Sequence, residues 1–257
     1  PTGLADILPP EAEFEAHITE VLMSSFAQYG YDRVKPPLIE FEDILLSGSG
    51  SNMAKQTFRM MDPISQRMLG VRADMTLQIA RIASTRLGDI QRPIRLSYAG
   101  QVLRVKGSNL RPKRQFGQIG VELVGSPSPK ADSEIILMAA DALSNLGIKN
   151  LSIDLCLPTL VPAICKSHKI DSPSIVSRLR VALDEKDKPA VEILEKELGK
   201  GTNSVFSSLL EAVGPVDKAL KNLKKINLPK DAATELSHLS DVISCLKRQT
   251  PDLTITI

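Results

Sequence analysis

The segment 92–125 constrains the fold more than any other part of the chain, because it has the pattern of a long β-hairpin. Residues 95–99 and 102–105 have the apolar, β-branched character of strands. The Gly, Ser, Asn and Pro residues between Val105 and Pro112 are typical of a turn. The returning arm, residues 115–123, alternates apolar and polar positions. The segment therefore predicts two antiparallel strands joined by a long loop.

The same hairpin has a polar composition that indicates a binding function. Seven Lys and Arg residues precede its first carboxylate, Glu122. Gln118 and Glu122 are four residues apart, so both side chains lie on one face of a strand. A carboxylate beside an amide suits an ammonium or imidazole group, whereas arginines suit a phosphate or carboxylate. The alternative is a solvated basic hairpin whose strands carry ordinary polar residues.

Composition narrows the class of protein. A chain of 257 residues with 42% hydrophobic content is long enough for one large domain with an appended module. Its net charge of +2 is too small for binding nucleic acid by bulk electrostatics, so a nucleic-acid partner is not expected. No apolar run is long enough for a membrane span, and the first residues do not have the pattern of a secretion signal. The three cysteines are widely spaced and have apolar neighbours: Cys156, Cys165 and Cys245. This pattern predicts buried free thiols and no metal site, and free thiols indicate a cytoplasmic location.

The first part of the chain is predicted to mix helices and strands. Apolar residues from Phe14 to Phe26 recur at helical spacing until Gly30, which predicts a first helix. The strand pattern at 31–40 is broken by Pro36 and Pro37, which favours an edge strand or an interface. Further predictions are a flexible loop at 47–52, a hairpin over 57–72 that turns at 62–65, and a helix that begins near Asp74.

The second part is predicted to be mainly helical. A linker at 126–130 precedes a helix at 131–146 and a short strand at 151–157, and helices with turn breaks then follow to residue 248. The segment 198–202 lacks a glycine that a phosphate-binding loop needs, so it is interpreted as a helix C-cap. The alternating residues 252–257 predict a strand that returns to the sheet of the first domain, and an end on a strand suggests a fragment of a longer protein.

Several motifs in this order resemble the class II aminoacyl-tRNA synthetases, specifically histidyl-tRNA synthetase and its paralogue, the ATP phosphoribosyltransferase regulatory subunit. The opening residues 1–9 look like the start of this family, residues 30–40 look like its motif 1, and residues 96–122 are similar to its motif 2. The resemblance implies an α+β fold with an antiparallel sheet flanked by helices. It also implies three parts: a core at 1–157, a helical insertion at 158–250, and a strand at 251–257 that returns to the core.

The resemblance also implies a histidine site. The family's histidine-binding carboxylate falls on Asp74 with Thr76 beside it, and the motif 2 arginine falls on Arg104. The glutamine and glutamate that contact histidine fall on Gln118 and Glu122. From its position at the start of a helical pattern, Asp74 could equally be a helix N-cap, and the two roles can coexist.

The ATP side of the family's site is altered in this chain. Lys106 stands where a synthetase carries an acidic residue, and Gly117 stands where it carries a histidine. A lysine donates hydrogen bonds only, so it cannot make the nucleotide contact of a carboxylate. The short carboxylate at Asp74 fits the regulatory paralogue, although Ala73 replaces a proline of both patterns.

The resemblance implies a noncatalytic regulatory subunit that binds L-histidine for feedback control of the first step of histidine biosynthesis. The implied partners are a catalytic subunit of ATP phosphoribosyltransferase and a second copy of the chain, as a homodimer within a hetero-oligomer. No catalytic residue, cofactor or metal is expected. The alternatives are a catalytic-domain fragment of histidyl-tRNA synthetase and a stand-alone binding module that has lost its ligand.

Overall fold

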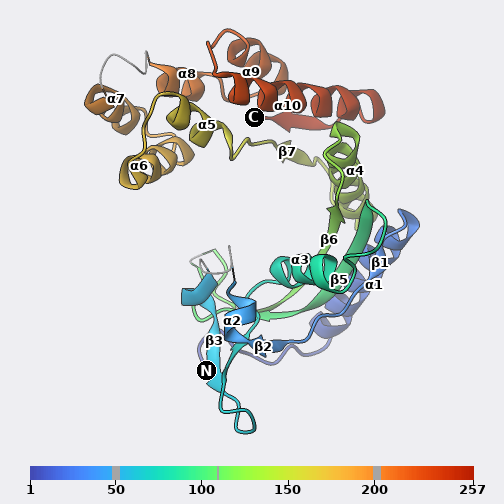
Figure 1. Cartoon of the computed structure of the whole chain (residues 1–257). Helices are drawn as coiled ribbons and strands as arrows, with labels where there is room; N and C mark the ends of the chain where they lie inside the picture. Colours follow the sequence, from blue (N-terminus) through green and yellow to red (C-terminus); the bar gives the residue numbers. More distant parts are fainter. Residues whose placement is uncertain (48–52, 109, 199–203) are drawn as a thin grey trace. The chain divides into compact units, whose positions relative to one another are not determined.

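The computed structural model of the chain describes residues 1–47, 53–108, 110–198 and 204–257. The chain divides into two compact units (Figure 1). Unit 1 comprises residues 1–127 and 138–148, and unit 2 comprises residues 128–137 and 149–257. The chain passes between the units at three points, and one of them, between residues 137 and 138, falls within helix α4 (Pro129–Asn145).

Unit 1 is built on the hairpin expected from residues 92–125. Strands β5 (Ile94–Leu103) and β6 (Gln115–Val124) pair antiparallel over ten residue pairs, which confirms that prediction. The short strand β1 (Asp32–Arg33) adds to β5 in parallel, so this sheet is mixed and not wholly antiparallel. β1 and β5 are joined by a long connection, which allows two strands to pair in parallel, whereas a hairpin requires its strands to be antiparallel.

Two helices pack against this sheet. The first is α1 (Glu11–Gln28), as predicted, and it ends where Gly30 takes a φ of +78° and the amide of Tyr31 bonds the carbonyl of Phe26. The second is α3 (Thr76–Thr85), which runs beside β5 and β6 (Figure 1). The residues buried between α3 and the hairpin form a small core: Met75, Ile79, Ala83, Ile94, Leu96, Tyr98 and Val102.

A second sheet lies N-terminal to α3 in the chain. It has the order β2-β4-β3, with β2 (Ile39–Phe41), β3 (Phe58–Met61) and β4 (Met68–Val71) all antiparallel. The predicted hairpin over 57–72 is thus confirmed, and Pro36 and Pro37 separate β1 from β2, which belong to different sheets. The short helix α2 (Glu42–Leu45) follows β2. Most of the loop predicted at 47–52 lies outside the described residues.

Unit 2 is mainly helical, as predicted, and has its own apolar core around Ile164, Leu179, Phe206 and Leu246. Its remaining helices are α5 (Leu160–Ser167), α6 (Pro173–Asp184), α7 (Lys188–Leu198), α8 (Val205–Glu211), α9 (Val216–Leu223) and α10 (Lys230–Gln249). The predicted C-cap at 198–202 falls almost entirely outside the described residues. Within the described part of the chain, no helix combines the length and apolarity that a membrane crossing requires.

The last strand joins neither of the two sheets described above, although it pairs with a strand that the sequence analysis placed in the core at 1–157. Strand β8 (Thr254–Thr256) pairs in parallel with β7 (Ser152–Asp154), and both belong to unit 2. The physical reason is Ile255, whose side chain is buried in the helical core of that unit. Pairing with β7 satisfies the backbone while it buries this side chain.

The cysteines differ from expectation at one position. Cys165 and Cys245 are buried free thiols, as predicted, whereas Cys156 is an exposed free thiol. Cys156 follows β7, where successive side chains point to alternate faces, so an apolar neighbourhood in sequence does not bury it.

Candidate functional site

The hairpin presents a polar floor to the start of α3. Directly opposed residues of an antiparallel pair share a face, and the register places Tyr98 opposite Gly120 and Gly100 opposite Gln118. Glu122, opposite Leu96, lies on the same face. The prediction that Gln118 and Glu122 share one side of a strand is therefore confirmed, and that side is the one that α3 covers in part.

Gln118 ties the loop before α3 to this floor. Its Nε2 donates a hydrogen bond of 2.8 Å to Oδ2 of Asp74, and its Oε1 accepts one of 2.9 Å from the amide of Met75. The other oxygen of Asp74, Oδ1, accepts from the amide of Thr76 at 2.8 Å. Thr76 is the first residue of α3, so Asp74 does satisfy a free amide at the helix start while it also faces the floor.

Tyr98 links the remaining two predicted residues. Its hydroxyl lies 3.3 Å from Oγ1 of Thr76 and donates to Oε1 of Glu122, also at 3.3 Å. Asp74, Thr76, Gln118 and Glu122 thus join into one hydrogen-bonded cluster through a residue that sequence reasoning did not select. The signal that could have found it is Gly120, because a bulky residue directly opposite a glycine can lie across the space of the missing side chain.

Burial sets the electrostatics of the cluster. Partial burial raises the pKa of Glu122, hydrogen bonds from Thr76 and Tyr98 counteract this, and the negative charge of Asp74 raises that pKa further. Burial likewise raises the pKa of the Tyr98 hydroxyl to about 12, so it remains a protonated donor at neutral pH. Two carboxylates thus face one half-buried space, and the ionised state of Glu122 is destabilised there.

Arg104 lies at the edge of this cluster rather than within it. Its Nε is 3.4 Å from the carbonyl oxygen of Ala73, the residue before Asp74, and its guanidinium lies 5.2 Å from the centre of the Phe116 ring. Sequence reasoning placed Arg104 among the site residues, and the structure brings it to the neighbouring backbone. Lys106, Arg111 and Lys113 of the same loop are exposed.

The arrangement suits a zwitterionic ligand. In the part of the chain that the structure describes, neither Asp74 nor Glu122 forms an ion pair with a Lys or Arg side chain. Their negative charge is therefore available to an ammonium or imidazolium donor, and Arg104 could receive a carboxylate beside them.

Comparison with known proteins identifies relatives of this chain. A family model described as histidyl-tRNA synthetase matches residues 3–257. A protein of Paramagnetospirillum magneticum named ATP phosphoribosyltransferase regulatory subunit is 52% identical over the whole chain, and the chain covers 66% of its length. A protein of Rhodospirillum centenum with the same name is 50% identical, and the chain covers all of its own length and 65% of that relative.

Solved structures agree on the fold. A crystal structure described as an ATP phosphoribosyltransferase regulatory subunit/histidyl-tRNA synthetase from Bacillus halodurans superposes with a TM-score of 0.85 at 24% identity, over the whole chain and 66% of that structure. A histidyl-tRNA synthetase from Nostoc superposes with a TM-score of 0.77 at 19% identity, over 99% of the chain and 59% of that structure. The α+β architecture is that of the class II synthetases, and the chain belongs to the histidyl-tRNA synthetase family.

Proposed function

We propose that the chain acts as a noncatalytic regulatory subunit of ATP phosphoribosyltransferase and binds L-histidine as a feedback effector. The observation that carries the proposal is the cluster on the floor, where Asp74 and Glu122 lie in one hydrogen-bonded group without a basic side chain from the described residues to neutralise them. The name shared by relatives at 44–52% identity supports the regulatory role. A cytoplasmic location belongs to the same proposal.

In this proposal each polar group of histidine has a complementary partner. Asp74 and Glu122 receive the ammonium and imidazole groups, Gln118 and Thr76 hold the carboxylates in place, and Arg104 receives the ligand carboxylate. Feedback requires only that histidine binds two states of the complex with different affinity, and a coupling free energy of about 1–3 kcal/mol is typical. The catalytic subunit would supply the groups that transfer the phosphoribosyl unit.

Substitution Glu122→Gln tests the site, because it removes the charge and keeps the size. We expect it to weaken histidine binding by about 1.5–3 kcal/mol, the contribution of a hydrogen bond to a charged group. Titration calorimetry measures this, with Glu192→Gln on the exposed face of α7 as the control for loss of one negative charge. Unchanged affinity together with a lower melting temperature would show that Glu122 is a structural residue of the core.

The pH dependence of binding offers a second measurement on the same variant. Because burial raises the pKa of Glu122 above 4.5, its carboxylate is protonated as the pH falls through that raised value, and histidine affinity should decrease there. Glu122→Gln should lack this component. A wild-type profile identical in shape to that of the variant would remove Glu122 from the binding site.

Noncatalytic behaviour rests on the altered ATP side. With Lys106 and Gly117 at the two positions described above, we expect no histidine-dependent exchange of pyrophosphate into ATP. Measurable exchange would support a synthetase instead.

Assembly as a homodimer is the remaining part of the proposal. Apolar side chains are exposed on and near α1, with Leu8 at 66% and Phe14 at 65%, and Leu38 and Ile39 are exposed just after Pro36 and Pro37. The proposal assigns these exposed apolar side chains to the face that a second copy covers. Light scattering at tens of micromolar should give a dimer mass, and Phe14→Glu should give a monomer. The matched control is Val181→Glu on α6, a residue 52% exposed in unit 2, which should leave the mass unchanged. A monomer in the wild type would contradict this part.

A further inference from the structure

In the proposed histidine site, Arg104 receives the ligand carboxylate, so the site depends on where Arg104 lies. Arg104 is the residue after β5, and its Nε donates to the carbonyl of Ala73 at 3.4 Å, next to Asp74. A long side chain can adopt many rotamers, so this single bond does not fix the guanidinium by itself. The groups that hold the Arg104 backbone therefore help to determine where a carboxylate can bind.

Arg114, on the other side of the basic loop, bonds both backbone groups of Arg104. The amide of Arg104 donates to the carbonyl of Arg114 at 2.8 Å, and the carbonyl of Arg104 accepts from Nε of Arg114 at 3.3 Å. The Arg114 guanidinium also lies 4.8 Å from the centre of the Phe58 ring, within the range of a cation–π contact. The Arg114 side chain is thus engaged with the protein itself and holds Arg104 from two directions.

The first residues of the chain hold Arg114 in turn. The amide of Arg114 donates to the carbonyl of Gly3 at 2.7 Å, and its Nη1 donates to the carbonyl of Thr2, 112 residues away in the chain, at 3.3 Å. Gly3 has a φ of +77°, and a Cβ there would lie 2.8 Å from both Cγ of Arg114 and the carbonyl oxygen of Pro112. Only glycine fits this close approach without strain. Residues 2 and 3 therefore pack directly against the base of the basic loop.

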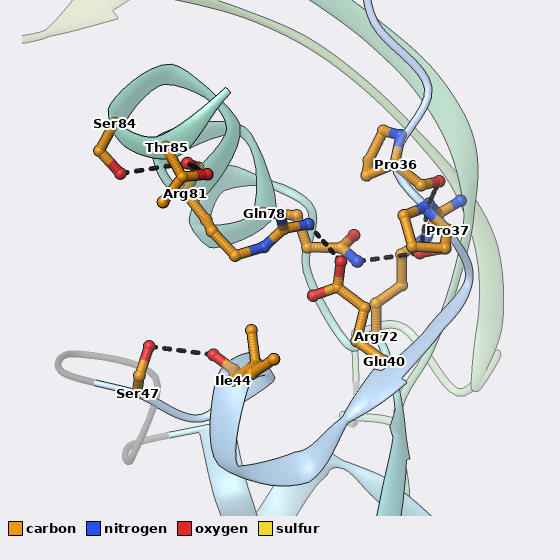
Figure 2. Close-up of polar contacts among 10 residues, drawn as sticks. All are labelled: Pro36, Pro37, Glu40, Ile44, Ser47, Arg72, Gln78, Arg81, Ser84 and Thr85. Carbon is orange, nitrogen blue, oxygen red and sulfur yellow. Dashed lines mark hydrogen bonds and ion pairs between the residues drawn. The ribbon is translucent and has the colours of Figure 1, made fainter. Parts of the chain in front are cut away.

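A different arginine, the buried Arg72, fixes the loop that leads to Asp74. Its Nη1 donates to the carbonyl of Pro36 at 2.9 Å (Figure 2), and its Nε donates to the carbonyl of Gln101 at 2.8 Å. These bonds do not involve the N-terminal residues or the basic loop. A change in the N-terminal contacts should therefore displace Arg104 and leave Asp74 in place.

We propose that Arg114, held by residues 2 and 3, is a positioning residue that places Arg104 to receive the ligand carboxylate and so makes the site selective for ligands that carry one. This inference rests on the proposed histidine site. Arg114 does not bind the ligand itself, because its guanidinium bonds the carbonyls of Thr2 and Arg104. It acts only through the backbone of Arg104.

The positioning role affects one end of the ligand only. Asp74 and Glu122, which receive the ammonium and imidazole groups in the proposed site, are held by Gln118 and Tyr98. Histamine has both of these groups and lacks the carboxylate. A change at Arg114 should therefore weaken the binding of histidine and spare that of histamine, whereas a general loosening of the site would weaken both.

Calorimetry and ligand-detected NMR on the full-length protein measure both ligands. We expect Arg114→Ala to weaken histidine at least about tenfold and to change histamine by less than about twofold. Arg114→Lys keeps the charge but cannot bond two carbonyls in the same geometry, so it should behave like Arg114→Ala. Arg111→Ala, which removes an exposed arginine of the same loop, is the matched control and should leave both affinities unchanged.

Two further variants separate positioning from a general structural effect. Gly3→Ala should act like Arg114→Ala, because its methyl group displaces the Arg114 side chain, and it serves if Arg114→Ala does not fold. In an Arg104→Met background, Arg114→Ala should change histidine affinity by less than about twofold, since it acts through Arg104.

The outcomes distinguish this inference from the proposed function. If the wild type binds histidine, three results would each overturn the positioning role: equal weakening of histidine and histamine, additive effects of the substitutions at 104 and 114, or wild-type selectivity in Arg114→Lys. A wild type that does not bind histidine would refute the proposed site itself, and this inference with it.

Discussion

Tyr98 and Gly120 show how single residues shape the polar floor. An added Cβ at Gly120 would lie 2.5 Å from the hydroxyl oxygen of Tyr98, so the tyrosine ring occupies the space that a side chain would need. A similar contact occurs at Gly100, where a Cβ would lie 2.4 Å from a guanidinium nitrogen of the buried Arg72. Two glycines on the hairpin therefore let large polar side chains lie flat against the sheet.

Gly120→Ala tests whether this packing positions the site. The methyl group must displace Tyr98 from Thr76 and Glu122, so we expect weaker histidine binding and a loss of about 1–3 kcal/mol of unfolding free energy, as for other overpacked sites. Gly117→Ala on the same strand is the matched control, because its Cβ would meet nothing closer than the Gln101 amide nitrogen at 3.8 Å. Calorimetric titration and denaturant unfolding measure both effects. Equal behaviour of the two variants would mean that the Tyr98 position does not matter.

Among the elements, α8 depends on a carboxylate from another helix. Glu195 of α7 is buried and accepts hydrogen bonds from the amides of Phe206 and Ser207 at 2.8 and 3.2 Å. It also accepts from the Ser207 hydroxyl at 2.5 Å. These amides belong to the first turn of α8, where backbone N–H groups have no acceptor within the helix. One buried charge thus satisfies the start of α8 and joins it to α7.

Glu195→Ala should therefore destabilise unit 2 by about 2–4 kcal/mol, because it leaves buried amides without an acceptor. Glu192→Ala, three residues earlier on the exposed face of α7, should change the unfolding free energy by less than about 0.5 kcal/mol. Urea unfolding followed by circular dichroism gives both values. A small effect at Glu195 would indicate that α8 contributes little to the cooperative unfolding of the unit.

At the scale of the whole molecule, the two units have separate apolar cores. The core of unit 1 lies between α3 and the β5–β6 hairpin, and that of unit 2 lies among α5 to α10. The proposed histidine site draws all of its residues from unit 1. A ligand that binds only the folded state stabilises it by about 2.7 kcal/mol at one hundred times its dissociation constant.

Differential scanning calorimetry should accordingly show two transitions, of which histidine raises one. The transition that shifts should be the one that Glu195→Ala leaves unchanged, since that substitution reports on unit 2. Glu122→Gln should suppress the shift and serves as the control for nonspecific stabilisation. A single transition that histidine raises as a whole would show instead that the units unfold together.

Local patterning determined much of unit 1. The strand–turn–strand pattern of residues 92–125 defined the β5–β6 hairpin, and the period of two placed Gln118 and Glu122 on one face, because that periodicity is a property of the extended backbone. Helical spacing and Gly30 similarly defined α1 and its end. The family motifs then singled out Asp74 and Thr76, which lie far from the hairpin in the chain and which local patterning could not connect to it.

Tertiary structure alone decided the rest. The terminal strand pairs with β7 in unit 2 and buries Ile255 in the helical core of that unit, and the alternation of the strand does not specify this partner. Tyr98 lies in the site and Arg104 lies beside it because of contacts between segments that are more than twenty residues apart in the chain. The periods of strands and helices depend on residues that are neighbours in the sequence, whereas the partners of a polar atom depend on the distant segment that packs against it.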